Sequence, residues 1–269
     1  MSTPSDTNWA LDKGLAAHSS AQNLPPAHSS AQYLPLPQVI VVTGTDTDVG
    51  KTVATAAIAA VLRRAGRSVA AYKPTQTGVA PAQPGDMAEV ARLAGIPTSE
   101  GCRLRAPMAP RPAAALEGAR LPALADHVRA VEALRHGHDH VLVEGAGGLL
   151  VELTDAGETL ADLAAGIDGS GVLVVARSAL GTLNHTMLTR EALARRGIPQ
   201  LGVVLGAWPA APTPVEVSNR DHFAALPEGL LGVIPEGAPD RASEEFAEAA
   251  PAWLPGLSQR MGTSCRIRP

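Results

Sequence analysis

The feature that most constrains this chain is a short apolar run that leads into a loop ending in Gly50-Lys51-Thr52. Residues 39–42 (Val-Ile-Val-Val) are all β-branched, which is typical of a strand buried on both faces. Residues 52–64 are alanine-rich and predict a helix that stops at Gly66. Backbone N–H groups at the start of such a helix attract anions. The pattern predicts a phosphate-binding loop, with Lys51 near the β- and γ-phosphates of a nucleotide and the Thr52 hydroxyl available to Mg²⁺.

The spacing of this loop departs from the common P-loop. The common pattern puts its first glycine at the position of Thr45, but the glycine here is Gly44, so the loop is one residue longer. The loop also carries Asp46 and Asp48, which would repel phosphates unless they face a metal or a cationic group. The alternatives are that both acids point to solvent or cap the helix. A turn that merely begins a helix competes with the nucleotide interpretation, and the Lys-Thr pair after the glycine disfavours it.

Apolar and helical segments alternate along the rest of the chain. We expect further strands at 68–72, 140–143, 172–176, 201–205 and 230–234, and further helices at 86–94, 123–135 and 184–196. Residues 97–122 are rich in proline and show little periodicity, so we expect an irregular connection there. The alternation predicts an α/β fold with a mostly parallel, doubly wound sheet, helices on both faces, and the general form of a P-loop NTPase. Ligands then bind at the carboxyl ends of the strands.

Composition sets the expected limits of the domain and its class. Residues 1–37 are rich in Ser, Ala, Pro, His and Gln and predict a disordered tail, residues 38–250 a single domain, and residues 251–269 a C-terminal tail. The formal charge of −4 argues against a nucleic-acid binder, and two cysteines exclude a disulfide scaffold. No apolar run reaches the ~18 residues of a membrane span, and no signal peptide is visible. We therefore expect a cytoplasmic protein that binds neither nucleic acid nor membrane.

Acidic residues at the same edge of the expected sheet can hold a metal. Glu144 ends an apolar strand and is followed by Gly145-Ala146-Gly147-Gly148, an arrangement similar to a Walker-B motif for Mg²⁺. The glycines let backbone approach a phosphate or substrate closely. Asp86 follows Gly85 at an expected helix start, where it is either a helix cap or a further ligand beside Thr52 and Glu144.

Two further segments end at this edge. Lys73 closes the expected second strand before Pro74 and can neutralise charge on a transferred phosphoryl group, although a surface lysine is the alternative. Residues 181–184 open a helix whose N-terminus suits a carboxylate, with capping by Thr182 or Asn184 as the alternative. The histidines of residues 136–140 precede a strand, so we expect a solvated loop at the opposite edge.

Four segments together resemble the dethiobiotin synthetase family. They are residues 42–53, Lys73-Pro74 with Thr77-Gly78, residues 143–148 and residues 180–185. The longer loop is that family's own form, and Leu149–Leu153 is most similar to actinobacterial members. The resemblance implies a C–N-forming cyclo-ligase. Such an enzyme uses ATP to carboxylate and close the ring of 7,8-diaminononanoate with CO₂, giving dethiobiotin through a carbamic–phosphoric anhydride.

The resemblance also implies roles for individual positions. Lys51 and Lys73 correspond to catalytic lysines, and Thr52, Asp86 and Glu144 to ligands of Mg²⁺. The implied nucleotide-binding positions are Asp48, Val49, Gly50, Lys51, Thr52, Val53, Asp86, Glu144, Gly145, Ala146, Gly147, Gly206, Ala207, Pro235, Glu236 and Gly237. The implied substrate positions are Thr47, Asp48, Lys73, Thr77, Gly147, Thr182, Leu183 and Asn184. In the family the last three reach the site of the neighbouring subunit, which implies a homodimer with two composite sites.

One position departs from the family pattern. Many members carry Asn-Asp after the fifth strand, where this chain has Gly206-Ala207, so we expect ATP or another nucleoside triphosphate to serve. The alternative function is a ParA/MinD-like ATPase switch, but such proteins carry a lysine where this chain has Asp46. An amide-forming ligase of the cobyrinate type needs a glutaminase domain with a cysteine nucleophile, and Cys265 lies in a short polar segment.

Overall fold

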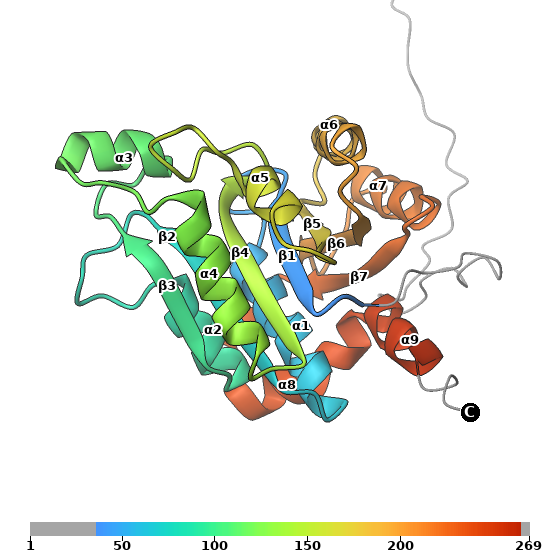
Figure 1. The fold of residues 1–269 in the computed structure, drawn as a ribbon. Coiled ribbons are helices and arrows are strands. Elements are labelled where there is room, and N and C mark those ends of the chain that lie inside the picture. The colour runs from blue at the N-terminus through green and yellow to red at the C-terminus, as the bar shows by residue number, and fades with distance from the viewer. Residues whose placement is uncertain (1–35, 265–269) are drawn as a thin grey trace, which may run out of the picture.

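All strands in the described part of the chain join one parallel sheet in the order β3-β2-β4-β1-β5-β6-β7 (Figure 1). The structure is a computed structural model that describes residues 36–264, so residues 1–35 of the expected tail (1–37) and the last five residues lie outside it. The strands are β1 (Val39–Gly44), β2 (Val69–Gln76), β3 (Thr98–Arg103), β4 (His140–Gly148), β5 (Gly171–Ala176), β6 (Gln200–Trp208) and β7 (Leu230–Pro235). The predicted parallel, doubly wound α/β fold is confirmed.

Helices cover both faces of this sheet (Figure 1). On one face α1 (Lys51–Arg64), α2 (Asp86–Ala94), α8 (Ser243–Trp253) and α9 (Pro255–Ser264) share an apolar core with the sheet. On the other face α4 (Leu124–Arg135) and α5 (Leu160–Ala165) pack over β1, β4 and β5. The chain is completed by α3 (Pro110–Glu117), α6 (Thr182–Arg195), α7 (Pro214–Ala224) and a short 3₁₀ turn, Ala238–Asp240.

β1 is the centre of the molecule. Every residue of this strand is buried, and Val41 pairs with Val143 of β4 on one side and with Val172 of β5 on the other. Its side chains therefore alternate between the two cores, which is why the strand reads as a continuous apolar run. This placement brings the ends of β1, β4 and β5 to one edge of the sheet.

The structure corrects the expectation for residues 97–122. This segment is not irregular throughout, because it contains β3 and α3. β3 has the sequence Thr-Ser-Glu-Gly-Cys-Arg and is only partly buried, so no apolar pattern announces it. It forms by pairing with β2, where Tyr72 lies opposite Ser99. Pro110 occupies the first turn of α3, where a missing N–H costs nothing.

The C-terminal boundary also differs from the expectation. Residues 251–264 do not lie apart from the domain as a tail, since they complete α8 and form α9. Leu254 and Leu257 are fully buried in the core beneath α1 and β7. A Cβ on Gly232 would lie 2.0 Å from the Trp253 carbonyl oxygen, so β7 and the end of α8 are in direct backbone contact.

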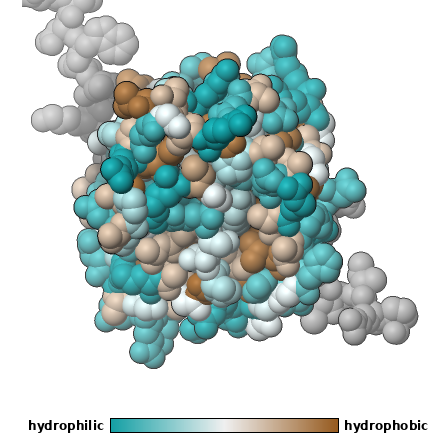
Figure 2. Space-filling view, turned by 60° about the vertical axis from the view of Figure 1, so that its left-hand side comes forward, coloured by the Kyte–Doolittle hydropathy of each residue, from teal (hydrophilic) through white to brown (hydrophobic). Residues whose placement is uncertain are grey.

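The surface carries both hydrophilic and hydrophobic residues. Figure 2 shows hydrophilic residues over much of one face, with hydrophobic residues in small separate groups. Within residues 36–264, no helix is both long and apolar enough to cross a membrane.

Candidate active site

The loop between β1 and α1 folds back on itself. The Thr45 N–H donates to the Val175 carbonyl (3.0 Å), and the Lys51 ammonium donates to the Asp46 carbonyl (2.8 Å). Asp48 and Gly50 both have positive φ, 54° and 90°, which lets the chain turn sharply before the helix begins. The backbone therefore wraps around the Lys51 amine, as the longer loop requires.

Close backbone packing fixes this loop against β6. A Cβ on Gly50 would lie 2.6 Å from the Gly206 carbonyl oxygen, and a Cβ on Gly206 would lie 2.0 Å from that of Val49. Neither position tolerates a side chain unless the backbone shifts. The glycine at 206 thus serves the contact between the loop and the end of β6.

Lys73 occupies the middle of the acidic cluster predicted from the sequence. Its ammonium lies 2.7 Å from Asp86 Oδ2 and 2.8 Å from Glu144 Oε1. Lys73 and Glu144 are buried, so this pair lies largely out of water. Burial disfavours the ammonium, but Glu144 and Asp86 outweigh that effect and raise the pKa of Lys73 above its ordinary value. The two carboxylates therefore favour the ammonium form of Lys73.

The surroundings of Lys51 shift its pKa in the opposite direction from that of Lys73. Burial lowers the pKa of Lys51 below its ordinary value, and the positive charge of Lys73 lowers it further. The site thus holds two buried lysines beside two carboxylates. An anionic ligand would supply the negative charge that favours the ammonium form of Lys51.

The oxygen donors around Glu144 suit Mg²⁺. The Thr52 hydroxyl donates to Glu144 Oε1 (3.0 Å), whereas Glu144 Oε2 is buried and has no hydrogen-bond partner. Such an atom is costly unless a cation or donor satisfies it. No group of three or more His, Cys, Asp and Glu side chains within residues 36–264 is placed to hold a metal. A magnesium site here would combine Glu144 and Asp86 with the Thr52 hydroxyl and phosphate oxygens.

Gln76 organises the second half of the cluster, a role that sequence reasoning missed. Its side-chain oxygen accepts the Asp86 N–H (2.8 Å), and its amide donates to the Thr77 carbonyl (3.0 Å). Gln76 thereby ties the start of α2 to the half-buried Thr77. Its burial and its place at the end of β2 became visible only in the structure, because the expected strand stopped at residue 72.

The loop acids Asp46 and Asp48 have different surroundings. Asp46 Oδ2 forms an ion pair with Arg177 (2.8 Å), and Asp46 Oδ1 accepts the Thr47 N–H (2.8 Å). The Thr47 N–H and the Arg177 guanidinium hold the pKa of Asp46 below its ordinary value. Asp48 is exposed and forms no ion pair within residues 36–264. Only Asp48 therefore stays available to a cationic ligand.

The glycine segment after Glu144 lies beside the loop. Gly44 pairs with Gly148, and a Cβ on Gly147, whose φ is 67°, would lie 3.7 Å from the Thr47 methyl. Gly145 is buried and Ala146 half-buried. These positions bring together Thr47 and Gly147, which the resemblance implies as substrate positions.

The two segments expected on the base side of a nucleotide lie next to each other. The Glu236 N–H donates to the Trp208 carbonyl (3.1 Å), so residues 235–237 lie next to residues 206–208. Ala207 and Pro235 are half-buried, and Glu236 and Gly237 are exposed. Val53 is half-buried in the first turn of α1.

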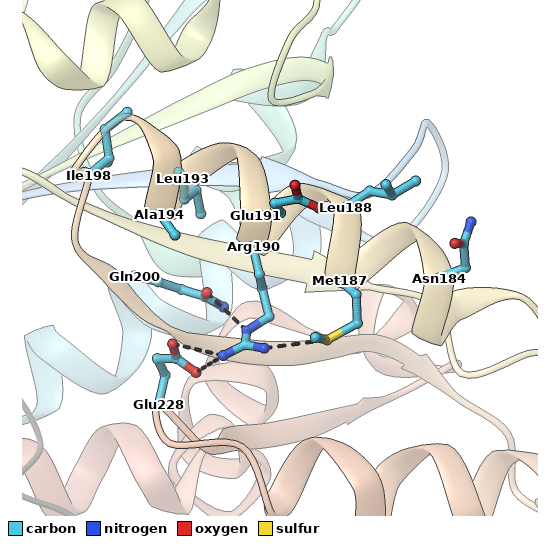
Figure 3. Close-up of a pocket in the computed structure, with 10 residues that line it drawn as sticks. All are labelled: Asn184, Met187, Leu188, Arg190, Glu191, Leu193, Ala194, Ile198, Gln200 and Glu228. Atoms are coloured by element: carbon cyan, nitrogen blue, oxygen red, sulfur yellow. Dashed lines mark hydrogen bonds and ion pairs between the residues drawn. The ribbon is translucent and has the colours of Figure 1, made fainter.

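Residues 182–184 lie at the start of α6, which follows β5. Thr182 is fully buried with no partner for its hydroxyl, Leu183 is half-buried and Asn184 is exposed. Asn184 lines a groove of about 480 Å³ along the outer side of α6 (Figure 3). The structure describes one chain, so the inter-subunit role expected for this segment remains a prediction.

The histidines of residues 136–140 lie at the amino end of β4, away from the phosphate loop. Nδ1 of His136, His138 and His140 is hydrogen-bonded to the carbonyl of Glu132, Leu134 and Pro37, respectively. These hydrogen bonds to the backbone explain the positions of the three imidazole rings, and no ligand is needed to explain them.

Comparisons with known proteins show what this chain is similar to. Residues 38–239 match a family described as an AAA domain. The chain is 51% identical over 218 residues to the ATP-dependent dethiobiotin synthetase BioD of Rhodococcus jostii, covering 80% of this chain and 94% of that one. It is 52% identical over 223 residues to the protein of the same name from Streptomyces avermitilis, covering 80% and 91%. The cell-division ATPase MinD of Pyrococcus furiosus matches in structure with a TM-score of 0.53 at 17% identity, covering 85% and 100%.

The fold and the loop define a P-loop nucleotide-binding protein with an AAA-type domain. The likeness to MinD shows the shared fold alone, because the identity is low. The sequence relatives are far closer, and the chain belongs to the ATP-dependent dethiobiotin synthetase family. The resemblance read from the four motifs is thereby confirmed, and the ATPase switch is not favoured.

Proposed function

We propose that this protein is a dethiobiotin synthetase, which uses ATP and CO₂ to close the ureido ring on 7,8-diaminononanoate. The observation that carries the proposal is the position of Lys73, held between Asp86 and Glu144 behind the phosphate loop. A fixed cation at this point can stabilise the negative charge that develops on a transferred phosphoryl group. Membership of the dethiobiotin synthetase family supports this assignment.

The reaction has three steps. One substrate amine adds to CO₂ and loses a proton, which gives a carbamate. A carbamate oxygen then attacks the γ-phosphorus and releases ADP. The second amine attacks the carbonyl carbon of the mixed anhydride and expels phosphate. Lys51 and the loop N–H groups hold the triphosphate, and Lys73 stabilises the carbamate and γ-phosphate charge.

Thr52, Asp86 and Glu144 are the residues that would hold Mg²⁺. When bound, this ion neutralises phosphate charge and orients the oxygens of the γ-phosphate. Lys73 contacts Glu144 Oε1 and Asp86 Oδ2, whereas the buried Glu144 Oε2 has no hydrogen-bond partner and would be open to the ion. Lys73 therefore balances the charge of the two carboxylates.

The diamine end of the substrate suits the exposed carboxylate of Asp48. Its negative charge attracts an ammonium group, whereas Asp46 is already paired with Arg177. Thr47, Thr77 and Gly147 complete this side of the site. The base-side residues Gly206, Ala207, Pro235, Glu236 and Gly237 include no amide side chain that could read adenine.

We also propose a homodimer in which residues 182–184 of one subunit reach the substrate carboxylate of the other. Leu180, Met187 and Leu188, which lie just before and along α6, are large apolar residues with exposed side chains. Figure 3 shows Met187 and Leu188 beside Asn184 at the groove. Exposed apolar groups of this kind favour burial against a partner. Because the reaction needs ATP, we place the protein in the cytoplasm.

The test is phosphate release with Mg-ATP and bicarbonate, with and without 7,8-diaminononanoate, followed by mass spectrometry of the product. We expect release that depends on the diamine, yields dethiobiotin and falls at least about 100-fold in Lys73→Ala. Arg111→Ala is a matched control, because Arg111 forms a surface ion pair with Glu152 and no hydrogen bond to the loop. Hydrolysis that ignores the diamine would instead favour an ATPase switch.

A further inference from the structure

Arg177 connects the end of β5 to the phosphate loop. It follows Ala176, the last residue of β5, and its Nη2 lies 2.8 Å from Asp46 Oδ2 across 131 positions of sequence. Its Nε is buried and has no hydrogen-bond partner. Within residues 36–264, Asp46 supplies the acceptor that this guanidinium contacts.

Asp46 is the residue through which the loop holds Lys51. Its carboxylate accepts from Arg177 and from the Thr47 N–H, while its carbonyl accepts from the Lys51 ammonium. The loop is tight at this point, since a Cβ on Gly44 would lie 2.6 Å from the Asp46 carbonyl oxygen. The placement of the Asp46 backbone therefore determines where the Lys51 amine rests.

The charge of Asp46 opposes nucleotide binding. A carboxylate within the loop repels the triphosphate that the loop N–H groups attract. Arg177 supplies a compensating positive charge at the position of the Asp46 carboxylate. Both side chains are nearly half exposed, so the pair alone adds little stability. Its effect on a nearby ligand of high charge is expected to be larger.

We propose that Arg177 is a positioning residue of the nucleotide site, which neutralises Asp46 and thereby holds the loop in a form that accepts phosphate. This inference rests on the proposed function only in requiring that a nucleotide binds at the loop. It adds a residue from the β5–α6 connection, which leads into the expected substrate-side segment 182–184 at the start of α6. The ion pair thus joins the phosphate loop to the connection that precedes that segment.

The test is a double-mutant cycle on Mg-ADP binding, measured by isothermal titration calorimetry with the full chain and no diamine. We expect Arg177→Ala to weaken binding roughly three- to tenfold, and Arg177→Lys to stay close to the unaltered protein. In the Asp46→Asn background, Arg177→Ala should change the affinity by less than about twofold, because no carboxylate is left to neutralise. Arg111→Ala, which removes an ion pair of the same length and similar exposure, should leave binding unchanged.

Two outcomes would overturn the inference. If Arg177→Ala binds Mg-ADP as well as the unaltered protein, Asp46 needs no neutralisation. If Arg177→Ala loses equal affinity in both backgrounds, Arg177 contacts the nucleotide directly and does not act through Asp46. Failure of the unaltered protein to bind Mg-ADP would count against the proposed function instead.

Discussion

Lys73 and Glu144 form an ion pair of 2.8 Å in which both side chains are buried. Removing the ammonium leaves Glu144 with an uncompensated buried charge beside Asp86. We expect Lys73→Met, which keeps the apolar stem, to destabilise the metal-free protein by about 3 kcal/mol. Added Mg²⁺ should restore part of this loss, because a cation beside Glu144 would offset the same uncompensated charge. Thermal unfolding with and without Mg²⁺ measures this, and equal stabilisation of both proteins would contradict this charge balance.

A second prediction follows from the contact between Gly50 and Gly206. Gly206→Ala places a methyl group 2.0 Å from the Val49 carbonyl oxygen, so the loop must move. We expect a loss of about 1–3 kcal/mol in stability and a fall of about 100-fold in synthetase activity. Gly137→Ala is the matched control, because a Cβ there meets nothing within 4 Å. Normal activity in Gly206→Ala would show that the loop tolerates the shift.

Nucleotide choice should be broad. The residues at the end of β6, Gly206 and Ala207, offer no side-chain hydrogen bond to a base. We expect kcat/KM for GTP and CTP within about tenfold of that for ATP, since strong discrimination needs polar groups that fit one base. A panel of nucleoside triphosphates at fixed Mg²⁺ checks this. Activity with ATP alone would point to backbone groups of residues 235–237 as the readers.

The exposed apolar side of α6 predicts self-association. Leu188 is 57% exposed, and a glutamate in its place would put a charge into any interface formed there. We expect Leu188→Glu to raise the dimer dissociation constant at least about tenfold and to lower activity at dilute concentrations. Leu116→Glu on α3 is the control, as Leu116 is 70% exposed and lies outside this groove. Analytical ultracentrifugation gives the result, and identical behaviour of the two variants would place the interface elsewhere.

Ionisation of Tyr72 should lower the stability of the protein at alkaline pH. Burial, and then the negative charges of Asp126 and Cys102, raise the pKa of Tyr72 from 10.0 to about 12. Its contribution to stability is complete below pH 10 and is lost as the pH rises through about 12, because the unfolded chain ionises first. In a Tyr33→Phe background, ultraviolet titration reports Tyr72 alone. Tyr72→Phe should flatten the stability profile, whereas an unchanged profile would exclude this group as the cause.

Local patterns in the sequence were enough to predict the phosphate loop and most of the sheet. Residues 39–52 are contiguous, so their strand, loop and helix start follow from chain geometry alone. Lys73 and Glu144 were predicted to lie at one edge because parallel strands end there. The structure places them 2.8 Å apart.

Contacts between distant segments decided the features that no local sequence pattern indicates. Asp46 and Arg177 form an ion pair across 131 positions of sequence, and the local sequence around either residue does not indicate its partner. β3 and α9 carry few periodic apolar residues, and they take their structure from β2 and from the buried core. The backbone at Gly206 packs directly against the Val49 carbonyl, and this contact exists only once the loop has folded. The sequence by itself determined that the functional groups lie along one edge, since the carboxyl ends of parallel strands meet there. The order of the strands was decided by folding. The pairing and charge balance of the functional groups depended on contacts between segments far apart in the chain, which only folding brings together.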